Sequence, residues 1–337
     1  MAVHALIFGC GSTMLSATER AFFKDVQPWG LILFKRNVAD RAQLLRLTQD
    51  FRDIVGREDA PVLIDQEGGR VQRLGPPHWP AYPSASSFAR IGDPLLRRAA
   101  VRLGARLIAH DLRALGITVD CLPVLDVPVA GANQVISDRA YGTKPEEVAI
   151  SGRAAAEGLL AGGVLPVIKH IPGHGRAMED SHHALPHVTA SREALVAHDF
   201  APFRALADMP LAMTAHVVFA AVDEREPATL SRRMFAEVIR GEIGYDGLVM
   251  TDDLSMNALS GSFADRTRRA YAAGCDIVLH CNGEREEMEA VASAARLLSG
   301  KARKRAEIAL ARIRHEPEPF DSVDGRSRFE DLLAGSR

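Results

Sequence analysis

The sequence predicts one (β/α)8 barrel, and three observations support that fold class. The chain has 337 residues, more than the ~100–200 of an ordinary domain but suited to a closed α/β barrel of ~250 residues with insertions. Short apolar segments, many of them rich in β-branched residues, recur along the chain, and each is followed by a stretch with helical periodicity. No linker rich in proline, glycine and serine interrupts this alternation before residue 315.

Eight apolar segments are candidates for the barrel strands. Strands that alternate with helices favour a parallel sheet covered on both faces, whose strands are apolar throughout their length. In order, the segments are AVHALIF from Ala2, GLILF from Gly30, APVLID from Ala60, ITVDCLPVLDV from Ile117, VLPVIKH from Val164, PLAMTAH from Pro210, GLVMTD from Gly247 and CDIVLH from Cys275. A repeat number of eight predicts that the sheet closes on itself.

The segments between these strands have the periodicity of amphipathic helices. We expect helices at 40–55, 94–115, 145–160, 192–207, 232–243, 265–273 and 284–298, and a first connection around 17–24. Near residue 315 the composition changes to EPEPFDSVDGRSR, which is typical of a mobile or loosely docked end. We therefore place the catalytic barrel at 1–314 and a C-terminal tail at 315–337.

A doubly wound sheet is the competing fold, because Gly9-Cys-Gly11 follows the first strand as in a dinucleotide-binding turn. Met14 stands where the third glycine of that motif should be, and an isolated Gly-x-Gly is weak support for nucleotide binding. The sequence therefore favours the barrel without a bound dinucleotide.

Composition and charge exclude several classes of protein. Apolar residues make up 47% and charged residues 25%, close to the globular average, so disorder, collagen and coiled coil are excluded. The formal charge of −2 provides no global attraction for nucleic acid or an anionic membrane. The N-terminal segment lacks the features of a secretory signal, and the four cysteines show no Cys-x-x-Cys spacing. These features predict a soluble cytoplasmic protein with reduced thiols and no nucleic-acid or membrane partner.

Titratable residues end the predicted strands, where the chemistry of such barrels takes place. Any one of them has an equally good interpretation as a helix cap or a structural ion pair. Charged groups at the ends of apolar strands are costly to bury without a partner, however, and seven such residues at five strand ends converging on one rim favour a site. These positions are Asp65, Asp126, Lys169 with His170, His216, and Asp252 with Asp253.

Five of the twelve histidines fall between residues 170 and 187, within a loop rich in glycine and proline. One interpretation is a metal site, although neither His-Glu-x-x-His nor an early His-x-His is present. The other is acid/base catalysis, because Asp180 lies two residues from His182 and such a pair can pass a proton to a leaving group near neutral pH. Asp252 would then serve as nucleophile or electrostatic stabiliser.

Five motifs together resemble glycoside hydrolase family 3. They are KHIPGHG from Lys169, DSH from Asp180, TDDLSM from Thr251, IDQEGGRVQRL from Ile64 and ISDRAY from Ile136. The resemblance extends from about Leu31 to Cys281 and is greatest to the family's single-domain bacterial β-N-acetylglucosaminidases, which act in peptidoglycan recycling. Ile171, Ser137 and Tyr141 depart from the usual phenylalanine, glycine and phenylalanine of these motifs.

The resemblance implies a retaining double displacement without a cofactor or metal. It assigns the nucleophile to Asp252 and the acid/base to His182, oriented by Asp180, where most glycosidases use a second carboxylate. It also implies a monomer whose substrate is a small muropeptide or glycan with terminal, non-reducing β-linked N-acetylglucosamine, such as N-acetylglucosaminyl-1,6-anhydro-N-acetylmuramic acid peptides. The residues that would bind the sugar are Asp65, Arg73, Arg139, Lys169 and His170.

Length bears on the acid/base residue. Larger members of glycoside hydrolase family 3 often have a second domain that supplies the acid/base carboxylate. In 337 residues, eight β/α units leave no room for such a domain. We therefore expect the acid to come from a barrel loop, as Asp180 and His182 would provide.

Other residues near the expected site have two interpretations each. We expect Asp253 to support its neighbours or cap a helix, and His174, His183 and His187 to structure the loop. Glu67, Arg70 and Asp138 are either sugar contacts or loop ion pairs. Two alternative functions remain: a metal-dependent barrel hydrolase that uses the histidines at 170–187, and a non-catalytic sugar-binding barrel.

Overall fold

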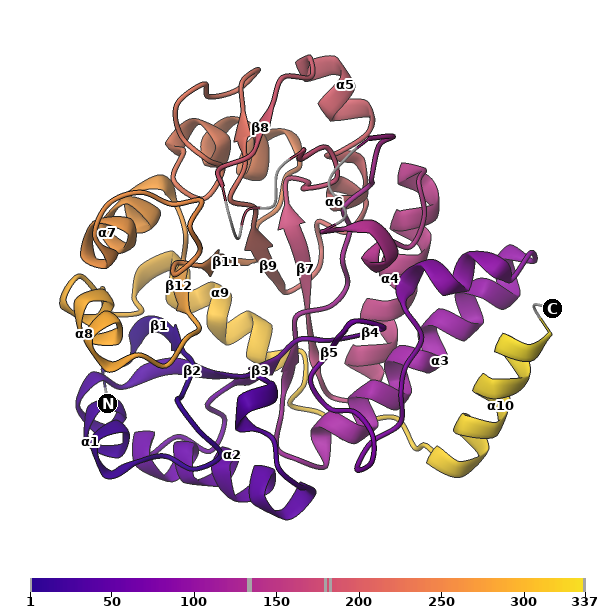
Figure 1. Ribbon diagram of the computed structural model, residues 1–337, viewed down its shortest axis with the longest axis horizontal. Helices are drawn as coiled ribbons and strands as arrows, with labels where there is room; N and C mark the ends of the chain where they lie inside the picture. The colour runs from indigo at the N-terminus through magenta and orange to yellow at the C-terminus, as the bar shows by residue number, and fades with distance from the viewer. Residues whose placement is uncertain (1, 132–134, 179–180, 182–183, 336–337) are drawn as a thin grey trace.

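The computed structural model describes residues 2–131, 135–178, 181 and 184–335. Eight parallel strands close into a barrel, and helices surround it (Figure 1). In ring order the strands are β1 (His4–Phe8), β2 (Pro28–Leu33), β3 (Val62–Ile64), β6 (Val119–Asp120), β7 (Leu165–Ile171), β9 (Leu211–Thr214), β11 (Leu248–Asp253) and β12 (Ile277–His280). Each overlaps one of the eight predicted apolar segments, so the predicted (β/α)8 fold is confirmed.

The barrel strands are buried along nearly their whole length. Every residue of β2, β3, β7, β9 and β12 is buried, because side chains point alternately into the barrel and towards the helices. The core is continuous from Leu6 in β1 to Val278 in β12. All four cysteines are buried free thiols.

The helices of the outer layer begin where the sequence provides capping side chains. Ser16 and Glu19 form a capping box at the start of α1, Asp40 caps α2, and Asp93 caps α3 just before Pro94. The longer helices are α1 (Ala17–Val26), α2 (Arg41–Val55), α3 (Pro94–Arg113), α4 (Pro145–Ala161), α7 (Phe263–Ala273), α8 (Arg285–Ser293) and α9 (Gly300–Ala311), and a π-type helix spans Met234–Glu242.

The helix expected at 192–207 is broken in two, which corrects that prediction. α5 (Arg192–Ala197) and α6 (Ala201–Ala205) are separated by a turn that contains the buried residue Asp199. Asp199 forms an ion pair with Arg176 at 2.6 Å, and Pro202 lacks the N–H that a continuous helix would need at that position. A tertiary contact and a proline thus interrupt a pattern that is periodic on both sides.

The loops at the carboxyl ends of the strands position the site. Asp65 directly follows β3, and the next residues form a hairpin of β4 (Gln66–Gly68) and β5 (Val71–Gln72). Lys169 and His170 lie near the end of β7, and Asp252 lies near the end of β11. Two further short strands, β8 (His187–Val188) and β10 (Val218–Phe219), pair with one another.

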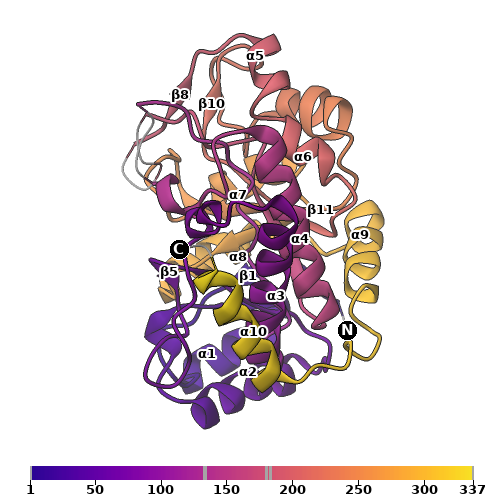
Figure 2. The ribbon, with the colours of Figure 1, turned by 90° about the vertical axis from the view of Figure 1, so that its right-hand side faces the viewer.

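The C-terminal segment ends in a helix that lies along α3. Residues 315–321 are irregular, and α10 (Ser322–Ala334) then lies beside α3, as Figures 1 and 2 both show. Phe329 of α10 is 6% exposed, and its ring packs beside Phe88 and against Gly104, which has no side chain. Arg326 of the same helix forms an ion pair with Asp111 at 2.8 Å. The boundary after residue 314 stays a prediction. Among the described residues, no helix is long and apolar enough to cross a bilayer.

Replacing Phe329 with alanine tests how firmly α10 is held. Because Phe329→Ala removes a buried ring and leaves a cavity beside Gly104, we expect the free energy of unfolding to fall by about 2–4 kcal/mol. Val323→Ala, on the exposed side of the same helix, is the control and should change it by less than ~0.5 kcal/mol. Urea denaturation measures both, and equal stability of the two variants would contradict this packing.

Candidate active site

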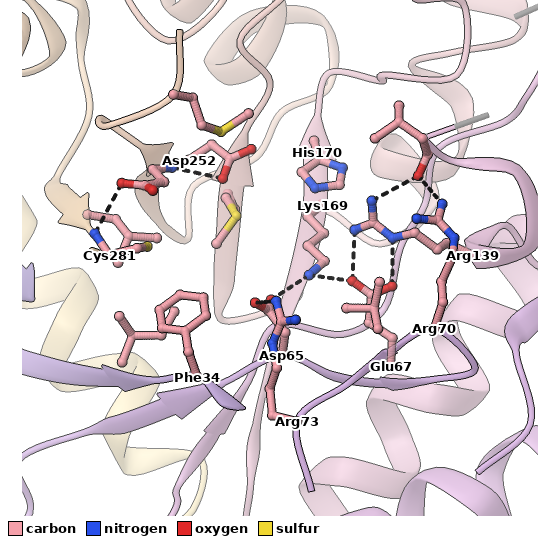
Figure 3. Close-up of a pocket in the computed structure, with 17 residues that line it drawn as sticks. Phe34, Asp65, Glu67, Arg70, Arg73, Arg139, Lys169, His170, Asp252 and Cys281 are labelled. Atoms are coloured by element: carbon pink, nitrogen blue, oxygen red, sulfur yellow. Dashed lines mark hydrogen bonds and ion pairs between the residues drawn. The ribbon is translucent and has the colours of Figure 1, made fainter. Parts of the chain in front are cut away.

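A pocket of about 580 Å³ opens at the carboxyl ends of the barrel strands. Its polar lining comes from the loops after β3 and β6, from β7 and from β11, and Figure 3 shows these side chains turned towards one another. Asp65, Glu67, Arg139, Lys169, His170 and Asp252 belong to this lining. Phe34, Met213 and Met256 contribute apolar surface that the sequence did not identify. The pocket thus unites the predicted sugar-binding residues with the predicted nucleophile.

Five side chains of alternating charge form one continuous row in this pocket. Arg73 donates to Asp65 at 2.8 Å, and Lys169 donates to the other oxygen of Asp65 at 3.0 Å. Lys169 also lies 2.7 Å from Glu67, whose two oxygens each accept from Arg139 at 2.8 Å. The charges alternate from Arg73 through Asp65, Lys169 and Glu67 to Arg139, and the row carries one net positive charge.

The pKa values of Asp65, Glu67 and Lys169 show that these three groups stay charged. Burial alone would raise the pKa of Asp65 and Glu67, but Lys169 and the neighbouring arginines lower them, Glu67 to about 2 and Asp65 well below its ordinary value. Burial alone would lower the pKa of Lys169, and the two carboxylates instead raise it above its ordinary value. Each charge is therefore maintained near neutral pH by its neighbours.

His170 is oriented by a buried carboxylate beneath the pocket. Nδ1 of His170 lies 2.7 Å from Asp126 Oδ2, while the other oxygen of Asp126 accepts from the backbone N–H groups of His170 and His174 at 3.2 and 2.6 Å. Burial would raise the pKa of Asp126, yet these contacts lower it to about 2. An ionised Asp126 favours the tautomer with hydrogen on Nδ1, which leaves Nε2 of His170 available to the pocket.

Asp252 lies across the pocket from Glu67 and Arg139 (Figure 3). Its Oδ1 accepts from the backbone N–H of Asp253 at 2.8 Å. Although burial would raise its pKa, nearby His170 and His216, this hydrogen bond and Lys169 lower it. Burial also lowers the pKa of His216, and the neighbouring Asp252 and Asp253 oppose that shift. Asp252 is therefore ionised, as a nucleophile must be.

The carboxylate of Asp253 supports the backbone of two strand ends. It accepts from the N–H groups of Ser255 and Cys281 at 3.0 and 3.1 Å, and His216 Nε2 lies 3.0 Å from its carbonyl oxygen. Asp253 thus lines the pocket while holding the backbone around it, which agrees with the expected supporting role.

Asp180, His182 and His183 lie outside the described residues, so their expected roles stay predictions. Ser181 between them is described and buried. Its Oγ lies 3.1 Å from Nε2 of His174, and its carbonyl accepts from the N–H of Ala258 at 3.2 Å. His174 therefore connects this loop to the barrel, as expected of a loop-structuring histidine.

The remaining ambiguous residues join two loops at the pocket entrance. Arg70 donates to Asp138 at 2.8 Å and to the carbonyl of Val135, so these two charges form an ion pair. Ser137 adopts φ of +33°, in the left-handed region that favours glycine. This explains physically why the family motif usually has glycine there. Among the described residues, no group of three histidine, cysteine or acidic side chains is arranged to hold a metal ion.

A carboxylate opposite a row of hydrogen-bonding charges, at the carboxyl rim of a closed α/β barrel, suits the class of barrel hydrolases. The family model described as "Glycosyl hydrolase family 3 N terminal domain" matches residues 7–315. The chain belongs to this family and is a glycosidase. The resemblance seen in its motifs is thereby confirmed, while the roles of single residues stay predictions.

Relatives and solved structures agree with this family. A protein named beta-hexosaminidase from Alkalilimnicola ehrlichii is 41% identical over 288 residues, covering 84% of this chain and 82% of that protein. Another of the same name from Bordetella avium is 40% identical over 274 residues, covering 80% and 77%.

Two solved structures have the same fold. NagZ from Neisseria gonorrhoeae, in complex with N-trifluoroacetyl-D-glucosamine, has a TM-score of 0.85 at 29% identity, covering 100% of this chain and 98% of that one. A family 3 beta-N-acetylglucosaminidase from Paenibacillus has a TM-score of 0.80 at 35% identity over 99% of this chain. This chain spans only 62% of the Paenibacillus protein's length.

The buried imidazole of His174 predicts an acid-sensitive contribution to stability. Burial and, to a smaller extent, His170 lower the pKa of His174 from 6.5 to about 4. Between these values the unfolded chain binds the proton and the folded one does not, so stability is complete above pH 6.5 and falls as the pH drops towards 4. We expect about 3 kcal/mol over this window, at ~1.4 kcal/mol per pKa unit.

His174→Gln removes this titration and keeps an amide that can contact Ser181. Its free energy of unfolding should therefore fall less steeply than that of the wild type between pH 6.5 and 4. The exposed His187→Gln is the control and should follow the wild-type curve. Urea denaturation at several pH values measures the slopes, and parallel curves for wild type and His174→Gln would contradict the assignment.

Proposed function

We propose that this glycosidase removes terminal, non-reducing β-linked N-acetylglucosamine from peptidoglycan fragments during cell-wall recycling in the cytoplasm. N-acetylglucosaminyl-1,6-anhydro-N-acetylmuramic acid peptides are the substrates that we expect. The observation that carries the proposal is the ionised Asp252 opposite the row from Asp65 to Arg139 in one pocket. The names of the relatives and of the Neisseria and Paenibacillus structures support the choice of sugar.

The charged row is suited to a neutral sugar rich in hydroxyl groups. Carboxylate oxygens of Asp65 accept hydroxyl hydrogens, and the guanidinium and ammonium groups of Arg73, Arg139 and Lys169 donate to hydroxyl or amide oxygens. His170 offers Nε2 to the same ring. Because the row is nearly neutral overall, it can orient a sugar without attracting a strongly charged ligand in its place.

The first step that we propose forms a glycosyl-enzyme. A carboxylate oxygen of Asp252 attacks the anomeric carbon, the bond from that carbon to the leaving oxygen breaks, and the leaving oxygen takes a proton from His182. In the second step His182 removes a proton from water, and the hydroxide oxygen bonds to the anomeric carbon and releases Asp252. Two inversions return the sugar in its original β configuration. Asp180 would orient His182 through both steps.

Asp252→Ala tests the nucleophile. Because no covalent intermediate can form without a carboxylate, we expect kcat/KM for a chromogenic β-N-acetylglucosaminide to fall by roughly a thousandfold or more. The surface variant Asp50→Ala, which breaks an exposed ion pair with Arg20, is the control and should retain wild-type activity. Activity in Asp252→Ala comparable to that of the control would refute the assignment.

His182→Ala tests the acid. The departing oxygen of an alkyl glycoside or muropeptide is basic and needs a proton, so kcat/KM should fall by about 10²–10⁴-fold. An activated aryl glycoside leaves without that proton, and its kcat/KM, which reports the first step, should change only a few-fold. His187→Ala is the matched control in the same loop. Equal losses for the two substrates would show that His182 is not the acid.

A further inference from the structure

We propose that Glu67 is the positioning residue of the sugar pocket: it fixes Lys169 and Arg139 and does not itself bind the sugar. This inference rests on the proposed function, because it concerns how the same site holds its substrate. Glu67 lies between two residues expected to bind the sugar and contacts both (Figure 3).

The carboxylate of Glu67 is occupied by protein cations. Oε1 lies 2.7 Å from Lys169 Nζ and accepts from Nη2 of Arg139 at 2.8 Å, while Oε2 accepts from Nε of Arg139 at 2.8 Å. Three of the roughly four lone-pair directions of a carboxylate are therefore used, and the side chain is only 4% exposed. With one direction left and so little exposed surface, Glu67 is a poorer acceptor for a sugar hydroxyl than Asp65, whose side chain is 15% exposed.

The backbone of the hairpin places Glu67 rigidly. Gln66, the residue before it, is buried and accepts from the N–H groups of Arg73 and Leu74 at 3.0 Å each. Gly68, the residue after it, has φ of +92°, and a Cβ there would lie 2.2 Å from the carbonyl oxygen of Pro83. Because both neighbours are held by packing and hydrogen bonds, the carboxylate of Glu67 has a fixed position. It can therefore fix the ends of the longer side chains of Lys169 and Arg139.

Glu67 is also the only link between the two halves of the row within the described contacts. Arg73, Asp65 and Lys169 form one half, and Arg139 forms the other. Without the charge of Glu67, the row would have three cations and only one carboxylate, Asp65. Lys169 and Arg139 would then be two buried cations with no carboxylate between them. They would repel one another, and the net charge of the row would rise from one to two.

Glu67→Gln tests this role because it keeps the shape and removes the charge. We expect KM for an uncharged aryl β-N-acetylglucosaminide to rise by ~10-fold or more, since misplaced buried cations weaken binding. We also expect inorganic phosphate to inhibit the variant at least several-fold more strongly than the wild type, because the pocket gains a positive charge. A purely structural role would not produce the second effect.

Two further variants separate charge from geometry. Glu67→Asp keeps the charge but is one methylene too short to contact both cations, so KM should rise while phosphate inhibition stays at the wild-type level. Asp276→Asn is the matched control, because Asp276 is a buried carboxylate that bridges Arg240 and Arg305 at 2.9 and 3.0 Å far from the pocket. It should lower stability without changing KM or phosphate inhibition.

The outcomes distinguish this inference from the proposed function. Wild-type KM and phosphate inhibition in Glu67→Gln, wild-type KM in Glu67→Asp, or the same changes in Asp276→Asn would overturn the role of Glu67. If Glu67→Gln does not fold, as judged by circular dichroism, the KM of Glu67→Asp decides. A wild-type enzyme that does not cleave the glycoside would refute the proposed function instead. Calorimetric titration of N-acetylglucosamine into wild type and Glu67→Asp would then still measure the role of Glu67 in binding.

Discussion

The site depends on a buried ammonium group. Lys169 is 2% exposed, and an ammonium ion withdrawn from water to that extent costs several kcal/mol unless carboxylates surround it. Asp65 and Glu67 provide that surrounding, but they in turn are buried and need Arg73 and Arg139. None of these five residues is stable in its position without its neighbours. The pocket is therefore assembled as a unit, with its hydrogen-bonding groups already oriented before a substrate enters.

The barrel makes such a unit possible. Asp65 and Lys169 are 104 residues apart in the sequence, and Glu67 and Arg139 are 72 apart. The closed sheet brings the ends of β3 and β7 to the same rim, and the loop that carries Arg139 reaches across from the end of β6. Beneath them, Asp126 holds both His170 and the backbone of His174, which in turn contacts Ser181. His170, which is expected to bind the sugar, and the loop with the expected acid thus share one buried carboxylate.

Periodicity and strand-end chemistry predicted much of this arrangement. The eight apolar segments predicted the barrel because strands that are covered on both faces are apolar throughout. That composition is a local property of their residues. Asp65, Lys169, His170 and Asp252 were predicted at the barrel rim because each is a titratable residue at the end of an apolar segment. The break between α5 and α6 was not predicted, since it depends on an ion pair between Asp199 and Arg176. The helix α10 was also missed, because its burial comes from Phe329 packing on α3.

The sequence by itself determined the fold class, the family and the residues available for chemistry, because these follow from local patterns and motifs. Only the tertiary structure decided which charges are partners. Glu67 could equally have been a sugar contact or a loop ion pair, and Arg70 and Asp138 had the same ambiguity. Coulombic and hydrogen-bond energies depend on distances of a few ångströms and on exclusion of water, and sequence spacing fixes neither. The fold determines both the distances and the exclusion of water. It places Glu67 in contact with Lys169 and Arg139, and it leaves Asp65 partly exposed in the pocket.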